Sequence, residues 1–255
     1  MDISVCIATY NGEMFIKEQL KSILSEIEPN DEVIIIDDCS NDNTVNIIKH
    51  FNDDRLKLYQ NKTNRGHVYT FAKAIEIANN ELIFLSDQDD VWEEGRVKTF
   101  KKYFRETDVI LISSNFSLFS KNSTKHMDHP LKKDDSTRFY KNISGILLGR
   151  RAYFGCAMAF RKELKKIIIP IPDYVESHDL WIAFAANLMK SNLHIEEITL
   201  RRRIHNKNVS NPNRSIIKKI QTRLLFMFQA IIEINCRIKK HFQLATKNND
   251  NNLTN

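Results

Sequence analysis

The sequence predicts an α/β protein in which helices cover both faces of a mostly parallel central sheet. Short apolar runs, rich in β-branched residues, alternate with stretches of helical periodicity through the first hundred residues. Strands that alternate with helices in this way form parallel sheets that are buried on both faces. The chain has 255 residues, 42% hydrophobic and 27% charged, which suits a globular domain with a sizeable core.

Each element follows from its own pattern. We expect strands at 3–8, 33–36, 56–59 and 82–85, one or two strands within 109–119, and two short strands at 193–198 and 200–204. We expect helices at 15–24, 45–51, 68–78, 94–104 and 180–189. The polar stretch 121–145 is expected to be irregular and to form a mobile insertion or lid near the site.

Polar residues follow three of the expected strands, at 9–12, 37–40 and 87–90. Ligands of open α/β sheets bind at the carboxyl ends of the strands. The three clusters are therefore expected to meet at one edge of the sheet and to form one site there. The G-x-G-x-x-G motif of dinucleotide oxidoreductases is absent, and so is a glycine-rich phosphate loop after the first strand, which argues against a sugar nucleotidyltransferase.

Two carboxylates, Asp87 and Asp89, stand two positions apart directly after a buried strand. Such a pair can bind one divalent cation that also contacts a diphosphate, and oxygen ligands suit Mg²⁺ or Mn²⁺. The alternative is a solvated acidic turn that caps the next helix. Both interpretations stay open from these residues alone.

Three further positions have two interpretations each. Asp38 follows a buried strand and either accepts a hydrogen bond from a pyrimidine base or forms part of a turn. Arg65 contacts a base or phosphate, or it is a surface residue of its loop. Asp179, between His178 and Leu180 at the start of a helix, is either a general base or a helix cap. A lone histidine such as His205 is usually structural, although neutral histidine also binds metals.

Taken together, these segments resemble the family 2 glycosyltransferases with a GT-A fold. The matching pieces, in order, are 4–12, 33–44, 64–66, 85–92 and 178–181, and the resemblance covers about residues 1–212. It implies that Thr9, Asn11, Asp38, Arg65 and Asp87 bind the nucleotide sugar. It also implies a metal site of Asp89, Asp87 and His205, and a catalytic base at Asp179. The usual Glu before that base is His178 here, which puts the acceptor contact of this position in doubt.

The resemblance implies an inverting, metal-dependent hexosyltransferase that uses Mn²⁺ or Mg²⁺. The donor would be a UDP- or dTDP-linked sugar, and the acceptor a saccharide or a lipid-linked molecule. Segments 87–92, 203–205 and 208–210 resemble the bacterial branch that builds surface polysaccharides such as lipopolysaccharide or capsule, rhamnosyltransferases among them. The alternative is a non-catalytic scaffold of a polysaccharide assembly complex, against which Asp87, Asp89 and Asp179 together argue.

We expect three parts: a GT-A catalytic domain at 1–212, a basic amphipathic C-terminal helix at 213–246 and a disordered tail at 247–255. Residues 213–241 hold seven Lys or Arg and one Glu, which accounts for the net charge of +6, so no nucleic-acid partner is expected. The apolar stripe of this helix suits the catalytic domain, a second copy in a homodimer, or an anionic membrane. Four scattered cysteines and the lack of a long apolar run predict a cytoplasmic protein, peripheral on the inner face of the cell membrane if the helix binds lipid.

Overall fold

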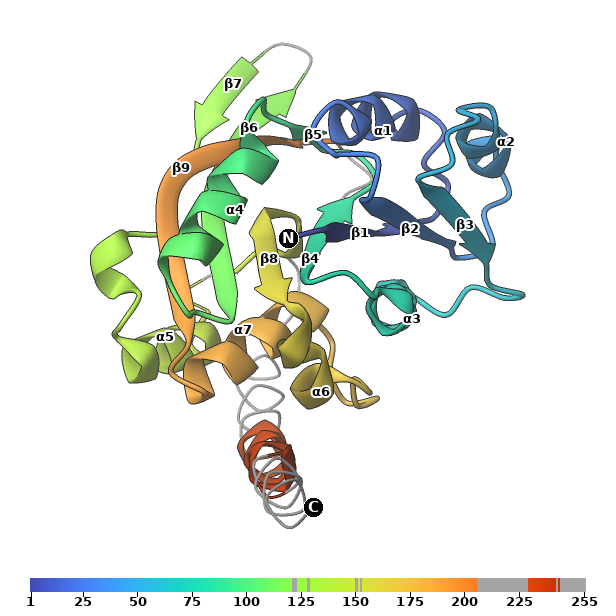
Figure 1. Cartoon of the computed structure of the whole chain (residues 1–255). Helices are drawn as coiled ribbons and strands as arrows, with labels where there is room; N and C mark the ends of the chain where they lie inside the picture. The colour runs from blue at the N-terminus through green and yellow to red at the C-terminus, as the bar shows by residue number, and fades with distance from the viewer. Residues whose placement is uncertain are drawn as a thin grey trace, which may run out of the picture.

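Four parallel strands from the first third of the chain form one half of the sheet in the computed structural model (Figure 1). The structure describes residues 1–120, 123–127, 129–149, 151, 153–205, 229–241 and 243. The parallel strands lie in the order β3 (Leu56–Gln60), β2 (Glu32–Asp37), β1 (Ile3–Thr9) and β4 (Leu82–Asp87). The α/β class and the parallel arrangement of this half are as predicted.

The second half of the sheet is mixed. Beyond β4 follow β8 (Met158–Arg161), β6 (Leu111–Ser120), β9 (Asn192–Arg203) and β5 (Val91–Trp92), and β7 (Ser123–His126) pairs with the outer part of β6. The β4–β8, β8–β6 and β9–β5 pairs are antiparallel, whereas β6 and β9 are parallel. In this mixed sheet β4, the strand that carries Asp87, lies between β1 from the start of the chain and β8 from a much later segment.

Helices cover both faces of the sheet, as predicted. Apolar side chains of α1 (Ile16–Leu24), α2 (Thr44–Lys49) and α4 (Arg96–Glu106) pack on one face, in one core cluster. On the other face lie α3 (His67–Ile77), α5 (Phe139–Leu147), α6 (Lys165–Ile168) and α7 (His178–Leu188). Successive residues of β1 alternate between the two clusters, Val5 in one and Cys6 in the other, because strand side chains point to opposite faces.

Two expectations for the second half are wrong. Residues 121–145 are not simply irregular, since their described part contains β7, a short 3₁₀ helix (Lys133–Asp135) and most of α5. The apolar face of α5 is buried against the core, so this segment is part of the domain. The two short strands expected at 193–204 are one strand, β9, with irregular pairing to β6 at Asn115.

The described part of the C-terminal segment, residues 229–241, is helical and packs on the domain beside α6 and α7. Ala230 and Ile234 are fully buried, and Arg237 donates to the backbone oxygens of Ile167 (2.9 Å) and Pro170 (2.8 Å). The apolar stripe of this part therefore contacts the catalytic domain. The rest of the expected helix and the tail lie outside the described residues.

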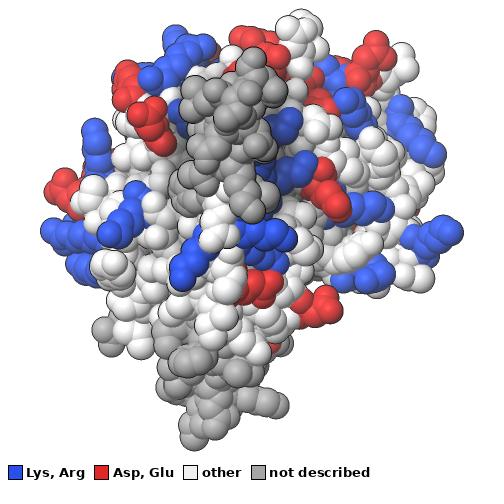
Figure 2. Space-filling model, turned by 60° about the horizontal axis from the view of Figure 1, so that its bottom comes forward, with Lys and Arg blue, Asp and Glu red and all other residues white. Residues whose placement is uncertain are grey.

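Charged side chains are interspersed over the face shown in Figure 2, where Lys and Arg alternate with Asp and Glu. Among the described residues, no helix is both long and apolar enough to cross a bilayer. All four cysteines are free thiols.

Candidate active site

A cavity of about 890 Å³ lies at the carboxyl ends of β1, β2 and β4. Its wall includes residues of all three polar clusters that follow these strands, among them Thr9, Asp38 and Asp87. The opposite wall comes from much later in the chain, from the turn before β8 and the start of α7, whereas the end of β9 lies beside the turn after β4. The convergence of the three clusters at one edge of the sheet is therefore as predicted.

Asp37 and Ser40 build the turn that closes the first part of this wall. The Asp37 carboxylate accepts hydrogen bonds from the Thr9 hydroxyl (3.0 Å) and from the backbone N–H (2.9 Å) and hydroxyl (2.5 Å) of Ser40. Asn11 lies across this turn, and its side-chain oxygen accepts the N–H of Asn41 at 2.8 Å. Thr9 and Asn11 both line the cavity, and the turn fixes their positions.

Asp38 lies in the cavity wall and is almost fully buried. Its carboxylate accepts three hydrogen bonds, from the backbone N–H groups of Arg65 (2.9 Å) and Gly66 (2.7 Å) and from the Asn61 amide (2.8 Å). Asp38 thus holds the loop before α3 against β2. The Arg65 guanidinium lies over the Tyr69 ring, 4.2 Å from its centre. Arg65 therefore contacts Asp38, which is predicted to bind the nucleotide, through its backbone N–H and not through its side chain.

Gln88, between the two metal-site candidates, ties the β4 turn to the β1 turn. Its side-chain amide accepts from the N–H of Tyr10 (2.9 Å) and donates to the carbonyl of Tyr10 (3.1 Å). Gly12 packs so closely on this amide that a Cβ at position 12 would overlap it. The two polar turns therefore form one rigid rim, in which Gln88 is a structural residue that the sequence did not single out.

Asp89 and His205 lie in direct contact although 116 positions separate them in the chain. Asp89 Oδ2 and His205 Nε2 are 2.6 Å apart, and the imidazole stacks on Phe15 with 4.6 Å between ring centres. Arg203 donates from Nε to the backbone oxygen of Asp89 at 3.0 Å, which anchors the end of β9 to the turn after β4. Asp89, His205 and the nearby Asp87 all line the cavity.

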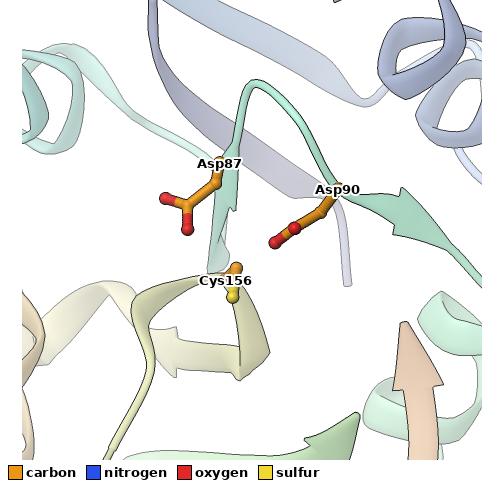
Figure 3. Close-up of side chains that lie close together, drawn as sticks. All are labelled: Asp87, Asp90 and Cys156. Carbon is orange, nitrogen blue, oxygen red and sulfur yellow. The ribbon is translucent and has the colours of Figure 1, made fainter. Parts of the chain in front are cut away.

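Beneath this rim, Asp87, Asp90 and Cys156 converge from two segments of the chain (Figure 3). Burial raises the pKa of Asp87 well above its usual value, and the charges of Asp90 and Asp89 raise it further. Burial, with the charge of Asp89, also raises the pKa of Asp90 to about 6. Burial likewise raises the pKa of the Cys156 thiol, which stays protonated and soft, so Cys156 is a poor ligand for Mg²⁺ or Mn²⁺.

Asp179 lies in the opposite wall, in the first turn of α7. One of its carboxylate oxygens, Oδ1, accepts from the Ser177 hydroxyl and from the N–H of Leu180 (2.8 Å). These contacts anchor Oδ1, and no residue that the structure describes forms a hydrogen bond with Oδ2. Asp179 and Asp87 both line the cavity, and the charge of Asp179 contributes to the raised pKa of Asp87.

His178 packs beside Asp179 as a buried, neutral imidazole. Its ring stacks on Phe71 with 4.1 Å between ring centres, and burial lowers its pKa to about 4. Gly155 allows this close packing, because a Cβ at that position would lie 3.0 Å from His178 Nε2. Neither ring nitrogen has a hydrogen-bond partner among the described residues.

Arg202 also lines the cavity, although the sequence pattern did not single it out as a site residue. Its two neighbours in β9 form ion pairs with acidic residues, whereas its own guanidinium lies 4.7 Å from the centre of the Phe154 ring. The available signal was the two-residue alternation of a strand, which places the middle arginine of three on the opposite face from the other two.

Comparisons with known proteins identify the family and the fold of the chain. The family model described as glycosyl transferase family 2 matches residues 4–168. The chain is 28% identical over 173 residues to the dTDP-rhamnosyl transferase RfbG of Shigella flexneri, an alignment that covers 64% of this chain and 57% of that protein. The chain thus spans little more than half the length of this relative.

Two solved structures are similar in fold. TarS 1–349 of S. aureus, in complex with UDP-GlcNAc, matches with a TM-score of 0.69 at 19% identity over 91% of this chain and 66% of that one. The mannosyltransferase PcManGT of Pyrobaculum calidifontis, in complex with GDP-Man and Mn²⁺, matches with a TM-score of 0.63 at 16% identity over 93% of this chain and 74% of that one. The chain belongs to glycosyltransferase family 2 and has the GT-A fold.

Proposed function

We propose that this protein is a metal-dependent, inverting hexosyltransferase that transfers a sugar from UDP or dTDP to a hydroxyl group of a saccharide or lipid-linked acceptor. One observation carries the proposal: a single cavity has Asp87, Asp89 and His205 on one side and Asp179 on the other. The name of RfbG supports a dTDP-linked donor and the UDP-GlcNAc complex of TarS supports a UDP-linked one. We assign the protein to bacterial surface polysaccharide synthesis because segments 87–92, 203–205 and 208–210 resemble that branch of the family.

The residues of the rim suit a divalent cation. Asp87 and Asp89 bring two carboxylates to one place. Burial raises the pKa of Asp87, the charges of Asp90 and Asp89 raise it further, and a cation would relieve this repulsion. His205 Nε2 lies within 2.6 Å of Asp89, so one ion can contact both groups after a small adjustment. Carboxylates suit Mg²⁺ and Mn²⁺, and the imidazole favours Mn²⁺. A bound cation would supply charge neutralisation for the departing diphosphate.

Asp179 is positioned to act as the general base. Oδ1 is held by Ser177 and Leu180, while Oδ2 can accept the proton of an acceptor hydroxyl. The hydroxyl oxygen forms a bond to the anomeric carbon as the bond from that carbon to the phosphate oxygen breaks, and the electron pair leaves with the nucleoside diphosphate. The proton goes to Asp179. One displacement of this kind inverts the anomeric configuration.

Asp38, Thr9 and Asn11 form the wall assigned to the nucleotide. Asp38 already accepts three protein hydrogen bonds, and a carboxylate offers about four lone-pair sites, so it can accept one more from a base N–H. His178 stays neutral beside Asp179 and so does not neutralise the base. Residues 1–205 hold all of these groups, and we propose 1–212 as the catalytic domain.

The test follows release of UDP or dTDP from the matching hexose donors, with Mn²⁺ and with EDTA. We expect Asp179→Asn to lower turnover by about 10³-fold without weakening binding of UDP or dTDP, because only proton transfer is lost. Asp89→Asn should weaken that binding and remove its dependence on Mn²⁺. Asp173→Asn, on the exposed surface before α7, is the matched control and should behave as the wild type. Near-normal turnover by Asp179→Asn would remove the base assignment.

A further inference from the structure

Three consecutive arginines end β9, and the outer two form ion pairs on the rim of the domain. Arg201 Nε lies 3.2 Å from Glu93, and an Nη atom of Arg203 lies 2.6 Å from Glu18. Side chains of a strand alternate between its faces, so the outer two share one face and Arg202 points to the other. That other face is the cavity wall.

Arg202 is held in the cavity by aromatic rings. Its guanidinium carbon lies 4.7 Å from the centre of the Phe154 ring and 5.9 Å from that of Phe116. Within the part of the chain that the structure describes, Arg202 forms no hydrogen bond and no ion pair closer than 4 Å. Stacking on rings fixes the plane of a guanidinium while its N–H donors stay available, and a planar array of donors matches phosphate oxygens.

With a divalent cation bound, the charges around Arg202 would balance, so an anion could bind there without net repulsion. Burial works against the charge of Arg202, but the carboxylates of Asp87, Asp90 and Asp89 favour it, and the pKa of Arg202 is raised. Three carboxylates, one divalent cation and one guanidinium together carry no net charge. Without the guanidinium, the same site would repel a diphosphate.

We propose that Arg202 binds the diphosphate of the sugar donor and stabilises the negative charge that forms on it as the sugar leaves. This inference rests on the proposed function and adds a binding residue to it. The bond between the anomeric carbon and the phosphate oxygen breaks with its electron pair on the oxygen, and Arg202 donates hydrogen bonds to the phosphate oxygens that receive this charge. The contact strengthens as the charge grows, so Arg202 acts on the leaving group and contributes to turnover as well as to binding.

The test compares the affinity for UDP with that for UMP, and for dTDP with that for dTMP, by calorimetry in Mn²⁺. Arg202→Met should lower the affinity for the diphosphates about tenfold and leave that for the monophosphates within about twofold, because the lost bonds are charge-assisted and reach the second phosphate. Arg202→Lys keeps the charge but not the planar donors, and should fall between the two. Arg201→Met, on the other face of the same strand, is the matched control and should change neither affinity.

Turnover gives a second measurement. Release of UDP or dTDP from the hexose donors should fall about 100-fold in Arg202→Met, the usual effect of removing one donor to a developing charge. An unchanged ratio of diphosphate to monophosphate affinity, with normal turnover, would overturn the proposal and leave the proposed function intact. If Arg202→Met does not fold, Arg202→Lys decides, because an unchanged ratio in that variant would also overturn it. Failure of the wild type to bind any of these diphosphates would overturn both.

Discussion

Acidification should weaken the folded protein through His194, a buried histidine on β9 far from the proposed catalytic groups. Its Nε2 atom lies 2.8 Å from the Tyr153 hydroxyl and 3.0 Å from the Asn192 amide nitrogen, while Nδ1 lies 3.2 Å from the carbonyl oxygen of Lys132. The amide nitrogen can only donate, so Nε2 accepts and Nδ1 carries the proton. A second proton has no place in this network, and burial lowers the pKa of His194 to about 4.

The size of this loss of stability follows from the pKa of His194 in the folded and in the unfolded protein. The unfolded protein binds a proton at His194 with the ordinary pKa of about 6.5, before the folded protein does. Stability is therefore fully present above that pH and is lost as the pH falls towards the folded value. With a folded pKa of about 4, the loss is roughly 2 kcal/mol at pH 5 and roughly 3 kcal/mol at pH 4.

Other groups change the pH response of the wild type, so the test is a comparison with His194→Gln. His178 acts in the same direction as His194, whereas Asp87 and Asp90, whose folded pKa values are raised, gain stability as the pH falls. Urea denaturation at pH 7, 6 and 5 gives the unfolding free energy of both proteins. We expect the advantage of the wild type to shrink by roughly 2 kcal/mol between pH 7 and pH 5. A constant difference over this range would refute the reasoning.

Two further predictions concern contacts between segments that are distant in the chain. Arg237→Met removes the bonds from the C-terminal helix to the end of α6 and should lower the unfolding free energy in urea by roughly 1–3 kcal/mol. The exposed Lys240→Met on the same helix is its control, and equal stability of the two variants would show that the helix is not braced there. Asp38→Ala leaves the N–H groups of Arg65 and Gly66 without their acceptor and should cost roughly 2 kcal/mol while weakening UDP or dTDP binding. Unchanged stability would show that this loop is held by other contacts.

The first half of the fold was predictable because its signals are local. The apolar runs of β1, β2 and β4 are buried strands, and the turn residues after them lie at the carboxyl ends that parallel strands share. That rule alone is enough to bring Thr9, Asp38 and Asp87 to one cavity. To predict that these three residues meet, it was enough to know that their strands run in the same direction.

The second half was harder to predict because polar residues have structural roles there. Asn142 lies on the buried face of α5 and donates to the Asp135 carbonyl at 2.9 Å, so a polar composition concealed a packed helix. Exposed residues in the middle of β9 and an irregular register with β6 split the apparent pattern of one long strand into two.

Contacts between distant segments were also hard to predict, because no local sequence pattern indicates them. The Asp89–His205 pair became a hypothesis only through the family resemblance, since a lone histidine carries no sign of its partner. The position of Arg202 in the cavity followed from strand alternation, but this needed the exact extent of β9.

The most direct test of the central claim is the melting temperature of the protein with UDP, dTDP, GDP and CDP, each with and without Mn²⁺. A ligand that binds only the native state raises the melting temperature, and the rise grows with the ratio of ligand concentration to Kd. The proposed site predicts a rise with UDP or dTDP that requires Mn²⁺ and that is lost in Asp89→Asn. The absence of a shift with all four diphosphates, in the presence of Mn²⁺, would contradict a metal-dependent nucleotide-sugar site.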